Sequence, residues 1–192
     1  MGQTTIVEFD PVRITNFGIK FQSDTEAQQF GATGQIDGET EMLTITKKKE
    51  GVTVKSISKP QSMTLKINAH VQVAPLRKIF GLSNEGLKPG IYSYGSDSIG
   101  EEFVLTADVI DDFEDVTKIL AFPNCSSSSG LTISIENGAD EVAELELEFT
   151  AMVDDNNKCY YEAFIEELDD PTIADQWRTN FSYDLVKEIP TP

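Results

Sequence analysis

The sequence predicts a mainly β fold, an antiparallel sandwich or barrel-like arrangement with one or two short helices and a long hairpin. Two stretches of alternating apolar and polar residues indicate it, because a period of two is typical of half-buried antiparallel strands. They are Ser62–Val73, with six apolar residues on one face, and Val142–Phe149, where Leu145, Leu147 and Phe149 alternate with glutamates. The third observation is composition: 39% hydrophobic and 25% charged residues are typical of a folded globular chain.

Six further segments have strand-like composition, and most are bounded by Gly, Pro, Asn or Asp turns. They are Glu41–Lys48, Val52–Lys59, Glu102–Ile110, Thr117–Pro123, Leu131–Glu136 and Cys159–Glu166. The first two are joined through Gly51, which can adopt the positive φ that a tight hairpin loop requires. The sequence therefore predicts a long hairpin with a basic tip, made of Lys47, Lys48, Lys49, Glu50 and Gly51.

Two segments have helical spacing. Ala74–Leu82 has a proline near its start, apolar residues three and four apart, and Gly81 near its end. Asp170–Phe181 has apolar residues at every fourth position, which favours a short amphipathic helix or a packed turn.

Ser126–Gly130 is only five residues long and lies between two strand candidates, so we expect a hairpin loop rather than a linker. Residues 1–192 are therefore expected to form a single domain.

Charge is distributed unevenly along the chain, whose net charge is −18 at pH 7. Residues 1–100 carry 11 basic and 10 acidic side chains, whereas residues 101–192 carry 4 basic and 23 acidic ones. The only cluster of basic residues is Lys47–Lys49, and tight DNA binding needs many more cations to displace the counterions of phosphate. The charge therefore argues against stable nucleic-acid binding. It suits a solubilising surface, or a channel to which DNA must not adhere.

No group of residues is typical of a catalytic, cofactor or metal site. The only histidine, His70, lies in the middle of a predicted strand on its polar face, and Cys125 and Cys159 are not spaced as a metal or redox motif. Asp154–Lys158 lacks the spacing of a calcium-binding loop. We expect no enzyme activity, no cofactor, no metal and two reduced thiols. No stretch approaches the roughly 18 apolar residues of a membrane span, so no membrane partner is expected.

Two blocks of the sequence resemble the major tail proteins of long-tailed phages and prophages of Gram-positive bacteria. The block over residues 31–82 includes GETEMLTITKKKEGVTVKS and SMTLKINAHVQVAPLRKIFGL. The block over residues 90–186 includes GIYSYGSDSIGEEFVLTADVIDD, ILAFPNC, ISIENGADEVAELELEFTAMVDDNNKCYYEAFIEELDD and WRTNFSYDLV. They occur in the order expected of that family. Ser126–Gly130 departs from the family's pattern. Residues 1–30 have no counterpart in the family, and we expect residues 1–30 to form a flexible or assembly-dependent N-terminal arm.

The resemblance implies a tail tube fold and a structural role. It implies that the chain binds other copies of itself in rings of six subunits, that the rings stack head to tail into a hollow tube, and that long hairpins reach between subunits or rings. Other expected partners are the tape measure protein and the tail terminator and initiator proteins, with double-stranded DNA passing through without adhering. The expected location is the virion tail, assembled in the bacterial host cytoplasm.

Within such a tube, two sets of residues are candidates for specific roles. The basic hairpin tip, Lys47 to Gly51, is expected to meet an acidic neighbouring subunit. Glu144, Glu146 and Glu148 are expected to line the lumen, where acidic walls repel phosphate. A solvated hairpin tip and a solvated outer sheet face are the alternatives.

Two other functions fit the sequence less well. One is a tube subunit of a contractile injection system or a type VI secretion-like system, because such tubes share their architecture with phage tails. The other is a carbohydrate-binding β-sandwich, which would need an exposed aromatic platform. Trp177 and most of the 11 phenylalanines occupy apolar positions instead.

Overall fold

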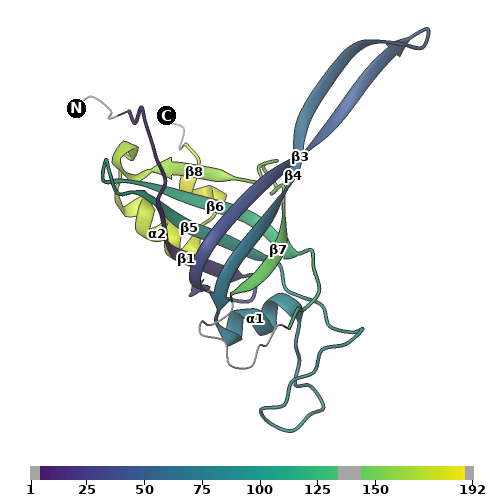
Figure 1. Cartoon of the computed structure of the whole chain (residues 1–192), viewed down its shortest axis with the longest axis vertical. Helices are drawn as coiled ribbons and strands as arrows, with labels where there is room; N and C mark the ends of the chain where they lie inside the picture. Colours follow the sequence, from purple (N-terminus) through teal and green to yellow (C-terminus); the bar gives the residue numbers. More distant parts are fainter. Residues whose placement is uncertain (1–4, 134–143, 189–192) are drawn as a thin grey trace.

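The computed structural model describes residues 5–133 and 144–188. Figure 1 shows a body of strands from which one long hairpin projects, with short helices on the surface of the body. The elements in chain order are β1 (Arg13–Phe21), β2 (Gln28–Gln29), β3 (Gly31–Lys49), β4 (Val52–Val71), α1 (Val73–Phe80), β5 (Phe103–Asp111), β6 (Val116–Ser127), β7 (Leu145–Met152), β8 (Tyr161–Phe164), a 3-10 turn (Ile165–Glu167), α2 (Thr172–Asn180) and α3 (Tyr183–Val186). The predicted mainly β, antiparallel fold with short helices is confirmed.

A single antiparallel sheet folds back on itself around the core. The strand order is β2-β1-β5-β6-β7-β4-β3, with β8 paired to β6. The chain runs from β2, which pairs with β1, through Phe30 into β3, which pairs with β4, so the two ends of the sheet meet there. The Phe30 N–H donates to the Phe17 carbonyl at 2.9 Å, and the Gln72 N–H donates to the Phe30 carbonyl at 3.0 Å. The body is therefore barrel-like, and its strand edges are largely paired.

Gly31 allows the chain to pass from β2 into β3 at this point. Its φ is 147°, and a Cβ built there would lie 1.9 Å from the His70 carbonyl oxygen. Any side chain would therefore force β3 away from β4, so only glycine fits this position.

Phenylalanine side chains fill the interior of the barrel. Five rings form a continuous series of edge-to-face contacts, with neighbouring centroids 4.6, 6.2, 5.0 and 5.7 Å apart. In order they are Phe17, Phe30, Phe149, Phe103 and Phe21, and none is more than 3% exposed. Each such pair contributes about 0.5–1.5 kcal/mol beyond the burial of its area. The strands of the barrel are thus held by one connected aromatic core.

Both predicted helices are present. α1 packs Ile79 and Phe80 onto the aromatic core and ends at Gly81, whose φ of 65° is typical of a helix C-terminus. α2 lies against the outer face of the sheet, where Trp177 Nε1 donates to the Leu120 carbonyl at 3.0 Å. α3 was not predicted from the sequence. Among the described residues, no helix has both the length and the apolar content needed to cross a membrane.

The N-terminal part of the chain differs from its prediction. Arg13–Phe21 was expected to belong to a flexible or assembly-dependent arm, but it forms β1 and pairs with β5. The physical reason is that Phe17, Ile19 and Phe21 alternate along the strand and all point into the core. The expectation of an arm is thereby limited to the residues before 13. The single-domain organisation stays a prediction.

The segment after β6 also differs from its prediction. Ser126–Gly130 is not a short hairpin loop, because β6 continues through Ser127 and pairs there with β7. Within the predicted strand Leu131–Glu136, residues 131–133 form no strand and residues 134–136 lie outside the described residues. Val142 and Ala143, predicted to begin the strand that contains β7, also lie outside them.

The two cysteines are free thiols, and both are buried. Cys125 is 0% exposed, and burial raises the pKa of its thiol, so little of the nucleophilic thiolate forms. We expect neither thiol of the native protein to react with a thiol reagent such as DTNB within minutes, whereas both react at once in denaturant. The absorbance of the aromatic thiolate released from DTNB measures the reaction. Rapid reaction of Cys125 in native buffer would contradict the barrel packing.

Candidate assembly surface

The predicted hairpin is present and is longer than the sequence indicated. β3 and β4 stay paired over nearly their whole lengths, whereas pairing was predicted only within 41–59. β4 pairs with β7 only from Ser62 onward, so before Ser62 it pairs with β3 alone and the two strands continue as a separate two-stranded arm (Figure 1). We call residues 42–60 the distal hairpin. Every residue in it is exposed, so it has no core of its own.

A β-bulge beside Pro60 marks the base of the distal hairpin. Glu41 pairs with Ser62 and Met42 pairs with Pro60, so Gln61 is the extra residue on β4. A bulge bends a strand and increases its twist. Pro60 has no N–H to donate and is tolerated on an arm that has only two strands. Together these features direct the hairpin away from the barrel.

The tip of the distal hairpin is a two-residue turn. Lys49 pairs with Val52, and the residues between them have positive φ, 52° at Glu50 and 82° at Gly51. Two consecutive positive φ values are typical of the type I′ turn, whose twist matches that of the flanking strands. The predicted positive φ at Gly51 is confirmed. The eight residues from Met42 to Lys49 extend the arm by about 25 Å beyond its base.

Replacing Gly51 by valine should open this turn. A Cβ at Gly51 would meet no atom within 4 Å, so the whole cost comes from its φ of 82°, about 1–2 kcal/mol for a residue with a side chain. We expect Gly51→Val to speed trypsin cleavage at the tip lysines while the thermal unfolding of the barrel stays unchanged. Glu50→Asn, which creates the Asn-Gly pair preferred in type I′ turns, should make the cleavage slower than in the parent chain. Equal cleavage of both variants would contradict the assigned turn.

One face of the distal hairpin carries an exposed apolar strip, which consists of Leu43, Ile45 and Ile57. These side chains are 48%, 57% and 47% exposed, and Ile45 lies directly opposite Ile57. The pattern of these residues predicts strands, but it gives no sign that their side chains would lack a covering core. Such contiguous apolar exposure marks interaction sites on soluble proteins.

The distal hairpin is also strongly basic. Five lysines lie in residues 42–60, and Glu50 is the only acidic residue among them. The five are Lys47, Lys48, Lys49, Lys55 and Lys59. Lys47 lies directly opposite Lys55, an arrangement that destabilises a strand pair, and no ion pair among the described residues involves any of the five. The rest of the chain has 10 basic and 32 acidic residues, so the arm and the remainder have opposite charge.

The three candidate glutamates lie together on the outside of the barrel. Glu146 and Glu148 on β7 lie opposite Asn68 and Lys66 of β4, while the alternating Leu147 and Phe149 point into the core. Glu144 Oε1 lies 3.9 Å from His70 Nε2. The predicted alternation is thus confirmed, and the lumen-facing role of these glutamates stays a prediction. The tip of the distal hairpin lies far from β7, the barrel strand that carries Glu146 and Glu148 (Figure 1).

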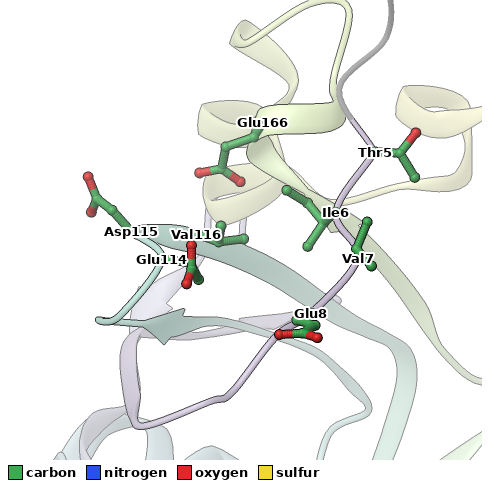
Figure 2. A pocket seen from close by; sticks show the side chains of 8 residues that line it. All are labelled: Thr5, Ile6, Val7, Glu8, Glu114, Asp115, Val116 and Glu166. Atoms are coloured by element: carbon green, nitrogen blue, oxygen red, sulfur yellow. The ribbon is translucent and has the colours of Figure 1, made fainter.

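An open hollow of about 500 Å³ lies between the N-terminal segment and the turn from β5 to β6. Figure 2 shows that its acidic side chains, among them Glu8, Asp115 and Glu166, are spread around it rather than directed at one point. Glu166 accepts hydrogen bonds from the Thr117 N–H at 3.2 and 3.4 Å. Over residues 5–133 and 144–188, no group of three or more His, Cys, Asp or Glu side chains could hold a metal ion.

Comparison with known proteins gave loose structural likenesses, among them two chains of the anti-feeding prophage. No family model matches the chain, and no curated protein matches it. A chain of the anti-feeding prophage cap, which terminates that particle's tube, aligns with a TM-score of 0.42 and 9% identity over 83% of this chain and 95% of its own. A chain of the six-fold symmetrised anti-feeding prophage baseplate aligns with a TM-score of 0.42 and 6% identity over 83% and 97%. Scores this low do not establish a relationship, so the function proposed below rests on this chain's own surface.

Proposed function

We propose that this chain is a structural subunit that polymerises as stacked rings into a phage tail tube. The observation that carries the proposal is the distal hairpin, an arm of 42–60 that is exposed on both faces and projects from a barrel whose own strands are largely paired. The resemblance of residues 31–82 and 90–186 to major tail proteins agrees with it.

The energetics of the arm favour a role in assembly. A two-stranded hairpin without a packed face is at best marginally stable in water. Here the arm also exposes the three aliphatic side chains of the apolar strip and places lysine opposite lysine. Covering the apolar strip would remove area from water at about 25 cal/mol per Å², and nearby carboxylates would relieve the repulsion among the lysines. A neighbouring subunit supplies both.

The opposed charges of the arm and the remainder favour one polarity of contact. A head-to-tail contact between unlike surfaces generates a ring where its rotation closes and an open filament where it does not, so such contacts can build stacked rings. The other features of the proposal are those of the major tail proteins that the sequence resembles: rings of six subunits, a tape measure protein inside the tube, and terminator and initiator proteins at its ends. DNA would pass through an acidic lumen, and assembly would take place in the host cytoplasm.

Glu144, Glu146 and Glu148 provide a test of the lumen. Changing all three to lysine should make the tubes retain double-stranded DNA, and the binding should weaken steeply as salt rises because counterions are released. The retained DNA should be protected from nuclease, as expected inside a channel. Changing all three to glutamine is the matched control and should retain none. DNA that is bound but fully digested would place these glutamates on the outside of the tube.

Negative-stain electron microscopy of the concentrated full-length chain tests the proposed function. We expect hollow rings or tubes of uniform diameter, with light scattering showing a mass that rises with concentration. A chain that stays monomeric at every concentration tested would contradict the proposal.

A further inference from the structure

The long connection between α1 and β5 forms the second large exposed feature of the molecule. We call residues 82–102 the α1–β5 loop. The distal hairpin and this loop lie toward opposite ends of the molecule's longest axis, with the barrel between them (Figure 1). In a head-to-tail stack, opposite ends of successive copies face each other. The loop is therefore placed to meet the arm of the next copy.

The α1–β5 loop exposes more large apolar side chains than any other described segment outside the distal hairpin. Five are at least 38% exposed: Leu87, Ile91, Tyr92, Tyr94 and Ile99. No other described connecting segment exposes more than two. Tyrosine and isoleucine in such a cluster are suited to cover an aliphatic strip, since aromatic side chains supply large contact areas at interfaces.

The charge of the α1–β5 loop is opposite to that of the distal hairpin. The loop has four acidic residues, namely Glu85, Asp97, Glu101 and Glu102, against the single basic Lys88. Glu101 and Glu102 accept hydrogen bonds from Ser23 and Gln22 of the barrel. Glu85 and Asp97 take part in no ion pair within the described part of the chain, so both carboxylates are available to lysines of another copy.

Internal contacts hold the α1–β5 loop in shape. Ser83 and Ser93 exchange backbone hydrogen bonds of 2.9 and 3.3 Å, which close the loop at its base. The Arg77 guanidinium lies 3.7 Å from the centroid of the Tyr92 ring, and the Tyr94 hydroxyl accepts the Leu131 N–H at 3.5 Å. A surface fixed before binding loses less conformational entropy when a partner docks.

We propose that the α1–β5 loop is the docking surface for the distal hairpin of the next copy in the stack. The apolar strip of Leu43, Ile45 and Ile57 packs on the exposed apolar side chains of the loop. The arm's lysines meet Glu85 and Asp97. This inference rests on the proposed function and specifies which two surfaces join successive copies.

Cysteine cross-linking between two variants tests the contact. Ile45→Cys carries a thiol on the arm, Ile91→Cys carries one on the loop, and the native cysteines are buried. When the two full-length variants are mixed at concentrations that form tubes and treated with a short bismaleimide, we expect a cross-linked dimer. The matched control pairs Ile45→Cys with Phe113→Cys, a residue 79% exposed at the turn from β5 to β6, and should give none. Tubes without the arm–loop cross-link would overturn the docking proposal and leave the tube intact, whereas absence of tubes would overturn both.

Charge reversal tests the same contact by its energy. Reversing the tip with Lys47→Glu, Lys48→Glu and Lys49→Glu, or reversing the loop with Glu85→Lys and Asp97→Lys, should each raise the concentration at which assembly begins about tenfold or more. Because the two changes are complementary, an equimolar mixture of the two variants should assemble nearly as well as the parent chain. Loss of assembly in each variant without recovery in the mixture would overturn the pairing of these surfaces.

Discussion

Removing the distal hairpin abolishes assembly and leaves the barrel folded: this is the largest functional effect that the structure predicts. Glu41 and Ser62 are paired across the two strands, so replacing residues 42–61 by Asn-Gly joins them through a two-residue type I′ turn. Because every removed residue is exposed, we expect the free energy of unfolding to change by no more than about 1 kcal/mol. Assembly should be lost at all concentrations at which the parent chain forms tubes.

Urea unfolding and light scattering measure the two parts of this prediction separately. Phe113→Ser is the control, because it removes an exposed apolar side chain from the turn between β5 and β6 without touching the arm. We expect it to assemble normally. Tubes formed by the variant without the distal hairpin would show that the arm does not join the subunits.

Phe149→Ala should have the largest effect on stability. The Phe149 side chain is 0% exposed and contacts both Phe30 and Phe103 edge to face, with centroids 6.2 and 5.0 Å away. Its loss leaves a cavity where rings from three parts of the barrel meet, which costs about 3–5 kcal/mol. In a chain of this size that lowers Tm by about 6–20 °C.

Thermal and urea unfolding followed by circular dichroism measure this cost. Phe113→Ala is the matched control, because it makes the same chemical change at a side chain that is 79% exposed, and it should change stability by less than about 0.5 kcal/mol. Similar losses in the two variants would mean that the aromatic series does not hold the barrel together.

The elements predicted best were those with a regular pattern. The alternation in Ser62–Val73 and around Leu147 follows directly from one buried and one solvated face, and the structure has these strands in β4 and β7. The helix predicted over Ala74–Leu82 was marked by Pro75 and Gly81, residues whose backbone preferences act locally. Such signals need no knowledge of the rest of the chain.

The elements that were missed depend on contacts distant in sequence. β1 has its own alternation of Phe17, Ile19 and Phe21, but its partner strand β5 is distant in sequence. The continuation of β6 through Ser127 is imposed by its pairing with β7, because serines have little strand preference of their own.

Only part of the candidate assembly surface could be predicted from the sequence. The lysine-rich tip and its turn are local, and both are present at the predicted residues. Leu43, Ile45 and Ile57 have the alternation of a half-buried strand, yet the arm projects beyond the barrel and leaves them exposed. Whether an alternating strand finds a core depends on where the sheet ends, and that is a property of the whole fold.

Hydrogen exchange of the distal hairpin shows whether this arm joins one subunit to the next. In the free subunit the backbone amides of residues 42–60 belong to an uncovered two-stranded arm and should exchange quickly, whereas those of β5 should exchange slowly. In assembled tubes, we expect the amides of 42–60 to become protected about a hundredfold or more while those of β5 change little. Equal exchange of residues 42–60 in free subunits and in tubes would contradict the claim that this arm joins one subunit to the next.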